Sequence, residues 1–89
     1  MRLPDEVAIV RTTPVFTVET VPPGLLHAHR SAPGVWGLIR VISGTVTFVQ
    51  EASGESRLLS EGDEQVIEPE VPHHVEPGSD SSFLVEFYR

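Results

Sequence analysis

The sequence predicts an all-β domain, and three features support that fold class. Seven glycines and eight prolines punctuate the 89-residue chain, with a spacing of roughly ten residues that is typical of turns between short strands. The segments between them are rich in β-branched residues, which favour strands. No window carries a sustained apolar period of 3.6 residues with helix caps. Short strands at regular spacing indicate a β-sandwich or a β-barrel.

Eight short runs are expected to form the strands. In chain order they are residues 15–21, 24–30, 35–42, 45–51, 56–60, 64–69, 71–76 and 82–88. A tight turn is expected at Gly44, because glycine adopts positive φ without steric cost. A hairpin turn is expected over residues 52–55, which read Ala-Ser-Gly-Glu, and loops are expected at residues 22–24 and 76–79.

The length of the chain indicates one small domain over residues 1–89, with residues 1–13 as a peripheral N-terminal segment. A chain of this size buries only about 60–65% of its unfolded surface, so its core is thin. Thin cores are often completed by a metal, a disulfide or a partner subunit. The chain has no cysteine, which excludes disulfides and thiolate metal sites. We therefore expect a metal held by histidine and carboxylate groups, and a homodimer that covers exposed sheet edges.

Charge and motif content exclude several classes of function. The formal net charge is −7, and most of the acidic residues lie after position 50. Such a domain repels phosphate backbones, which argues against nucleic acid as a partner. Lysine is absent, so neither Schiff-base nor P-loop lysine chemistry is available, and no serine has the setting of a nucleophile elbow. Because no secretory signal and no long apolar run is found, we expect a cytoplasmic protein that does not enter a membrane.

Strand alternation separates two adjacent histidines in the segment IEPEVPHHVEP, residues 67–77. Successive side chains of a strand point to opposite faces, so one face carries Ile67, Pro69, Val71, His73 and Val75. This face is apolar apart from His73, whereas His74 shares the other face with glutamates. His73 is therefore predicted to point inward, where an imidazole needs a hydrogen-bond or metal partner. His74 is predicted to lie in water.

The segment GLLHAHR, residues 24–30, supplies two more imidazoles. As a strand it would present His27 and His29 side by side on one face. Together with the inward His73, these side chains form a plausible metal site, because neutral imidazole is the commonest metal ligand. Three histidines with an open position suit a site of the catalytic type. Two other interpretations stay open: His29 and His73 form hydrogen bonds in a partly buried cleft, or His27 is simply exposed.

Three consecutive blocks of the sequence carry a family resemblance. They read LLHAHRSAPGVWGLIRVISGTVTFVQ, then LLSEGDEQVIEPEVPHHVEP, then FLVEFYR, and the resemblance covers about residues 14–89. The run PGVWG, the turn SGTVTF and the order of the blocks resemble the small cupin-like family of the tellurite-resistance TehB N-terminal region and of YeaR-like proteins. The resemblance implies a cupin-type double-stranded β-helix, which is a small jelly-roll barrel. It also implies a divalent metal ion inside the barrel: zinc, nickel or iron.

The resemblance implies a set of metal ligands. The glycine and histidine places of the two general cupin motifs are matched by Gly24, His27, His29, Gly44, Gly62 and His73. The carboxylate place of the first motif is empty, because no Asp or Glu occurs between Thr20 and Gln50. In the second motif, Glu68 and Glu70 stand where the general pattern has Pro and Gly.

The third ligand is open between His27 and Glu86. The pattern of the small family matches His29 and His73 better than His27. An acidic residue in the last strand also resembles a family feature, which makes Glu86 a candidate fourth ligand, a substitute for His27, or a residue that bonds to a ligand. The other interpretation of Glu86 is a surface or interface carboxylate.

Two functions of different classes follow from these observations. The first is a small metal-binding cupin module in a tellurite, oxyanion or stress response. Three neutral imidazoles leave the +2 charge of the ion uncompensated, which favours a small polar or anionic ligand at the open position. The second is a metal-dependent enzyme, an oxygenase or an isomerase, that uses the same ligands. Arg40, an arginine within an apolar strand, is expected to contact the anion; a salt bridge to a glutamate on a neighbouring strand is the alternative.

Overall fold

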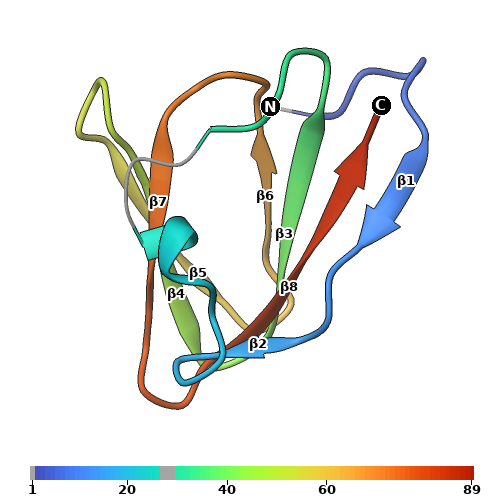
Figure 1. The fold of residues 1–89 in the computed structure, drawn as a ribbon. Coiled ribbons are helices and arrows are strands. Elements are labelled where there is room, and N and C mark those ends of the chain that lie inside the picture. Colours follow the sequence, from blue (N-terminus) through green and yellow to red (C-terminus); the bar gives the residue numbers. More distant parts are fainter. Residues whose placement is uncertain (1, 27–29) are drawn as a thin grey trace.

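The computed structural model describes residues 2–26 and 30–89 (Figure 1). These residues form strands and one short 3-10 helix, so the prediction of an all-β domain is confirmed. The elements are β1 (Ile9–Thr12), β2 (Phe16–Thr17), η1 (Pro23–Leu26), β3 (Trp36–Ser43), β4 (Thr45–Gln50), β5 (Ser56–Ser60), β6 (Glu64–Ile67), β7 (His73–Pro77) and β8 (Ser82–Tyr88). Within the described residues, no helix has the length and apolar character needed to span a bilayer.

The strands form two antiparallel sheets. The first sheet has the order β1-β8-β3-β6, and β2 also pairs with β8. The second sheet has the order β5-β4-β7. Figure 1 shows the second sheet facing the strands β3, β6 and β8, with η1 beside β7, against which it packs. The open space between the ribbons is filled by the side chains of the core.

The core lies between the facing sheets. Its buried apolar residues are Val21, Ile39, Val41, Val46, Phe48, Leu59, Ile67, Val75, Phe83 and Val85. Alternation explains this set, because Ile39 and Val41 of β3 point inward while Arg40 between them is only half-buried. Each such side chain contributes about 1.5–3 kcal/mol when it leaves water. Both sheets contribute to one continuous core, so each stabilises the other.

The chain passes from the first sheet to the second at Gly44, which has a φ of +68°. A Cβ atom at this position would lie 2.8 Å from the Cα of Ser81 and 2.9 Å from the carbonyl oxygen of Asp80. The return corner between β7 and β8 therefore packs directly on Gly44. It is held there by Gly78, whose N–H donates to the carbonyl of Thr45 over 2.8 Å. Both the backbone angle and the close approach require glycine. The sequence predicted the tight turn at Gly44, but it did not predict the close approach of residues 80–81.

Six of the predicted strands are confirmed, with boundaries that shift by at most two residues: β3, β4, β5, β6, β7 and β8. The predicted hairpin turn over residues 52–55 is also confirmed, because β4 and β5 pair on either side of it. In that turn Gly54 has a φ of +73°. These are the strands whose alternating patterns are longest, and period-2 alternation is a reliable signal when one face of a strand is buried.

Two strand predictions in the N-terminal third are wrong. Within 15–21 only Phe16–Thr17 is a strand, because the carbonyl of Thr17 accepts hydrogen bonds from the N–H groups of Thr20 and Val21 and closes a turn. Within 24–30 the chain begins as a 3-10 helix, in which the N–H of Leu25 donates to the carbonyl of Pro22. Consecutive prolines fix φ in the range that such a turn uses. Positions 27–29 of this run lie outside the described residues.

One strand was not expected at all. Residues 9–12, within the segment that the sequence analysis treats as peripheral, form β1 at the edge of the first sheet. All four of its residues are exposed. An edge strand that buries no face gives only a weak alternating pattern, so its sequence does not reveal it.

Replacing Gly44 by alanine is expected to destabilise the fold by about 2–5 kcal/mol, because two costs add together. Alanine is strained at the positive φ of this position, and its Cβ atom would clash with the backbone of residues 80–81. The free energy of unfolding in urea measures this loss. Gly54→Ala is the matched control: Gly54 also has positive φ, but nothing lies within 4 Å of its would-be Cβ, so a loss of only about 1–2 kcal/mol is expected there. Equal losses at the two positions would contradict the packing argument.

Candidate functional site

Of the three predicted histidine ligands, His73 is the one that lies within the described residues. Its side chain points inward, as the alternation predicts. Its side chain is only 2% exposed, and its ring stacks on Phe48 with 5.4 Å between centroids. Its Nδ1 lies 3.0 Å from the carbonyl oxygen of Val71. A carbonyl oxygen can only accept, so Nδ1 carries a proton and donates this bond. Metal-binding imidazoles commonly have this arrangement, in which the other ring nitrogen donates to a backbone carbonyl.

A cavity of about 10 Å³ lies beside His73 between the sheets, which is close to the volume that one water molecule needs. Apolar side chains from both sheets form most of its wall: Ile39, Ile67, Val75, Phe83, Val85 and Phe87. Leu25 and Ser31 complete the lining. The N–H of Glu70 donates to the carbonyl of Ser31 over 3.2 Å, which ties that segment to the loop before β7. The cavity has room for a single ion or water, and an organic substrate would not fit.

The other predicted histidine ligands, His27 and His29, lie outside the described residues. Leu25 lies two residues before His27 in the sequence, and Ser31 lies two residues after His29. Both Leu25 and Ser31 line the cavity of His73. Within residues 2–26 and 30–89, no three His, Asp or Glu side chains gather in a cluster that could hold a metal. Leu25 and Ser31 were not predicted to be cavity residues. Their place on either side of the His-Ala-His sequence is the signal that could have found them.

His74 faces away from the core, and the environment of its ring differs from that of His73. Its Nδ1 contacts the carboxylate of Glu51, and its Nε2 lies 2.8 Å from Oε2 of Glu76. Carboxylates only accept, so both ring nitrogens donate and the ring is an imidazolium. The bond to Glu76, followed by the bond to Glu51, raises the pKa of His74 above its ordinary value. A cationic ring with both nitrogens engaged does not ligate a metal, which distinguishes the two adjacent histidines.

Glu86 and Arg40 lie on the outer face of the first sheet. Glu86 accepts hydrogen bonds from Nε of Arg40 and from the hydroxyl of Tyr88, each over 2.9 Å. Burial alone would raise the pKa of Glu86, but the bonds from Arg40 and Tyr88 outweigh it and lower the pKa. Arg40 also pairs with Glu64, so the salt-bridge interpretation of Arg40 is confirmed. Contact of Arg40 with an anionic ligand and metal binding by Glu86 stay predictions.

The side chain of Glu86 points away from the cavity of His73. Residues at alternate positions of β8, Phe83, Val85 and Phe87, line that cavity, and alternation sends Glu86 to the opposite face. For Glu86 to bind the same ion as His73, β8 would have to turn over or slip by one residue. Its hydrogen bonds with Arg40 and Tyr88 oppose such a change.

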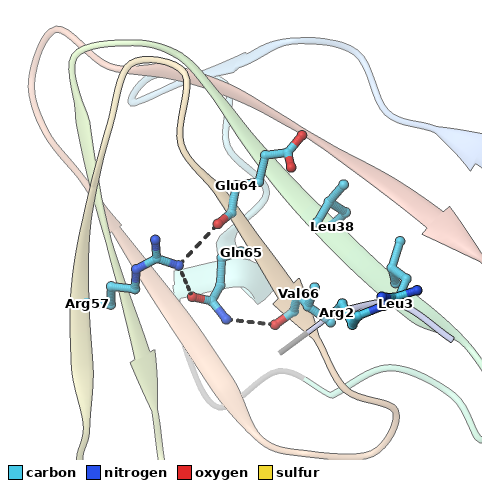
Figure 2. A pocket seen from close by; sticks show the side chains of 7 residues that line it. All are labelled: Arg2, Leu3, Leu38, Arg57, Glu64, Gln65 and Val66. Carbon is cyan, nitrogen blue, oxygen red and sulfur yellow. Dashed lines mark hydrogen bonds between the residues drawn. The ribbon is translucent and has the colours of Figure 1, made fainter.

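A surface hollow of about 450 Å³ lies on the outer side of β6 and beside the N-terminal segment (Figure 2). It is lined by Arg2, Leu3, Leu38, Arg57, Glu64, Gln65 and Val66. Arg57 donates to the carbonyl of Glu64 and to Oε1 of Gln65, and Gln65 donates to the carbonyl of Val66. Among the described residues, neither His73 nor Glu86 lines this hollow, and no residue of the His73 cavity does. The hydrogen bonds of Arg57 and Gln65 already engage much of the polar lining of this hollow within the protein. The hollow is therefore a weaker candidate site than the interior.

A second opening adjoins the interior. This groove of about 190 Å³ lies between β1, β2, η1 and β8, and it shares Leu25, Val85 and Phe87 with the His73 cavity. The side chains of these three residues therefore lie between the groove and the cavity. Arg11 of β1 lies at its rim, with its guanidinium 5.2 Å from the centre of the Phe87 ring.

The raised pKa of His74 predicts a pH-dependent contribution to stability. A group whose pKa is higher in the folded state stabilises the fold fully below its unfolded pKa, and the contribution is lost as pH rises through the folded value. His74→Gln should therefore lower the melting temperature by a few degrees near pH 6 and much less near pH 9. Thermal unfolding followed by circular dichroism measures both. An equal difference between variant and wild type at the two pH values would contradict the assignment.

Comparison with known proteins places the chain in a family. The TehB-like domain family matches residues 11–85. A YeaR protein of Escherichia coli strain K12, described as uncharacterized, is 26% identical over 98 residues, which cover 99% of this chain and 82% of that protein. The YeaR protein of Escherichia coli O157:H7 matches to the same extent.

Two solved structures share the fold. A structural-genomics crystal structure of a protein from Escherichia coli K12 superposes with a TM-score of 0.93 at 25% identity, covering 100% of this chain and 96% of that one. The crystal structure of TehB from Haemophilus influenzae gives a TM-score of 0.84 at 24% identity, covering 94% of this chain and 32% of TehB. This chain thus corresponds in fold to about a third of TehB. The match over residues 11–85 spans most of the sequence, and the chain belongs to the TehB-like family.

Proposed function

We propose that this protein is a small metal-binding module with a cupin-type double-stranded β-helix, in which His27, His29 and His73 hold one divalent ion between the sheets. One observation carries the proposal. Leu25 and Ser31, which bracket the His-Ala-His sequence, line the same cavity as the buried imidazole of His73. This shared lining supports a site to which two distant segments of the chain would contribute ligands.

The donor chemistry fits a divalent ion of the zinc, nickel or iron type. Nδ1 of His73 donates to a backbone carbonyl, and such a bond fixes the orientation of an imidazole and makes it a better ligand. Three neutral imidazoles would leave the ion with its full +2 charge, and when bound it would attract a small anion or hydroxide at an open position. The resemblance to the TehB family favours an oxyanion such as tellurite as that ligand, in an oxyanion or stress response.

A metal-dependent enzyme, an oxygenase or isomerase, is the second candidate function, and the groove beside the interior favours it. A small substrate could approach from that groove. The residue expected to serve as its general base is Glu86, and two observations weigh against that role. Glu86 faces away from the cavity, and its bonds to Arg40 and Tyr88 lower its pKa, which makes the carboxylate a weaker base. The binding module is therefore the better-supported function.

Metal analysis of protein purified without an affinity tag tests the proposal. Wild type expressed with sufficient metal should carry close to one ion per chain. His73→Gln should lower the metal affinity by at least about tenfold, because a ligand is removed. His74→Gln is the matched control and should retain the metal, because the His74 ring is bonded to two carboxylates on the other face.

Circular dichroism spectra of both variants confirm that they fold. Equal metal loss from the two variants would show that the distinction between the adjacent histidines is wrong. Unchanged metal content in His27→Gln and in His29→Gln would show that the ligand set is wrong.

Oxygen uptake separates the two candidate functions. If the module is the correct function, the iron-loaded protein should consume no oxygen beyond the buffer rate when small organic acids or oxyanions are added. The His73→Gln variant provides the background rate. Uptake that depends on an added compound and disappears in His73→Gln would establish the enzyme instead.

A further inference from the structure

A β-bulge in β1 determines the direction of Arg11. Pairing of Ile9 with Tyr88 would, if continuous, place Arg11 opposite Glu86 on the outer face of the sheet. The register shifts between Ile9 and Arg11, so that Arg11 instead lies opposite Phe87. Directly opposed residues of an antiparallel pair point to the same side, and Phe87 lines the interior cavity. The bulge therefore turns the arginine from the carboxylate of Glu86 toward the open side of the interior, as bulges at barrel rims often do.

The groove below Arg11 is apolar. Phe16, Leu25, Val85 and Phe87 supply most of its surface. The hydroxyl of Thr13, the uncharged polar side chain in the lining, is already engaged: it accepts from the N–H of Val85 and donates to the carbonyl of Pro14. Among the described residues, a ligand in this groove would therefore meet apolar surface along its body and the guanidinium of Arg11 at the rim.

Arg11 differs from Arg40 in its partners. Arg40 bonds to two glutamates. For Arg11 the described part of the chain provides the face of Phe87 at 5.2 Å and no carboxylate within ion-pair distance. A cation above an aromatic ring keeps its N–H groups available for a bidentate bond to a planar anion. In a protein with a net charge of −7, an arginine that forms no ion pair with a described carboxylate is suited to an anionic ligand.

We propose that Arg11 and the adjoining groove bind a small organic monocarboxylate, with its carboxylate on the guanidinium and its apolar body along Phe16, Leu25 and Phe87. The volume limits the size of that body. An engineered cavity of about 150 Å³ accommodates benzene, so a groove of about 190 Å³ accommodates a body of benzene size. It is smaller than the ~300–1,000 Å³ of pockets for drug-sized ligands. The inference deepens the proposed function by naming a ligand class, but the Arg11 contact itself does not require the metal.

A titration with benzoate, followed by nitrogen–proton NMR, tests the proposal. Benzoate should shift the amide signals of Thr13, Val85 and Phe87, and benzamide, its uncharged analogue, should bind more weakly. Arg11→Gln should weaken benzoate binding about three- to tenfold, the range expected for one exposed charge-assisted pair. Arg2→Gln is the charge-matched control, because it removes the same charge from a side chain that pairs with Asp5 on the surface. Melting curves of both variants verify folding.

Titrations of the protein as purified and after chelator treatment distinguish this inference from the metal proposal. Arg11-dependent binding in both preparations supports the inference, whether or not metal is found. Benzoate binding that Arg11→Gln leaves unchanged overturns it, and so does equal binding of benzoate and benzamide. Benzoate binding that disappears with the metal and is insensitive to Arg11→Gln also overturns it, while supporting an anion site at the metal.

Discussion

The pairing of β7 with β4 is the constraint on which the interior site depends. It sets His73 opposite Gln50 and His74 opposite Val49. The neighbouring pair, Phe48 and Val75, is buried on the core side and holds this register. A slip of one residue would move every side chain of β7 to the other face. It would bury the ring of His74, which donates to two carboxylates, and expose the buried ring of His73. Burying the charged His74 group would cost free energy.

The same alternation keeps charge on the outside of the sheets. Arg40, Glu64 and Glu86 form one ion-paired group on the outer face of the first sheet, and His74 joins two glutamates on the outer face of the second. These pairs satisfy one another at the surface. The interior keeps the buried imidazole of His73 beside a cavity about the size of one water. An ion placed there would be the dominant local charge, so its ligands and any anion near it would respond mainly to that charge.

The sequence predicted the middle and C-terminal strands well, because each presents one apolar face with period-2 alternation. The inward direction of His73 and the outward direction of His74 came from this pattern, and both are confirmed. The pattern fails where local hydrogen bonds decide the backbone. The prolines before Leu25 initiate a 3-10 turn, and Thr17 closes a turn with Thr20 and Val21. Both local structures interrupt segments whose composition favours strands.

The direction of Arg11 could not be predicted for a different reason. Its face depends on one extra residue in an exposed edge strand, and a bulge leaves no mark in the alternation of a strand that buries neither side. The hypothesis that the two histidine segments converge came from alternation together with the family resemblance. What supports it in the structure is that Leu25 and Ser31, which flank residues 27–29, line the cavity of His73. Three-dimensional proximity between segments about forty residues apart is information that spacing alone does not contain.

Anomalous diffraction from crystals of the metal-loaded protein, measured at the absorption edge of the bound element, tests the central claim most directly. The account predicts one anomalous peak per chain between the two sheets, about 2.0–2.1 Å from Nε2 of His73 for zinc, with imidazoles of the His27–His29 segment completing the ligand set. A peak bound elsewhere on the chain would contradict it. So would a fully loaded crystal in which the ring of His73 contacts only protein.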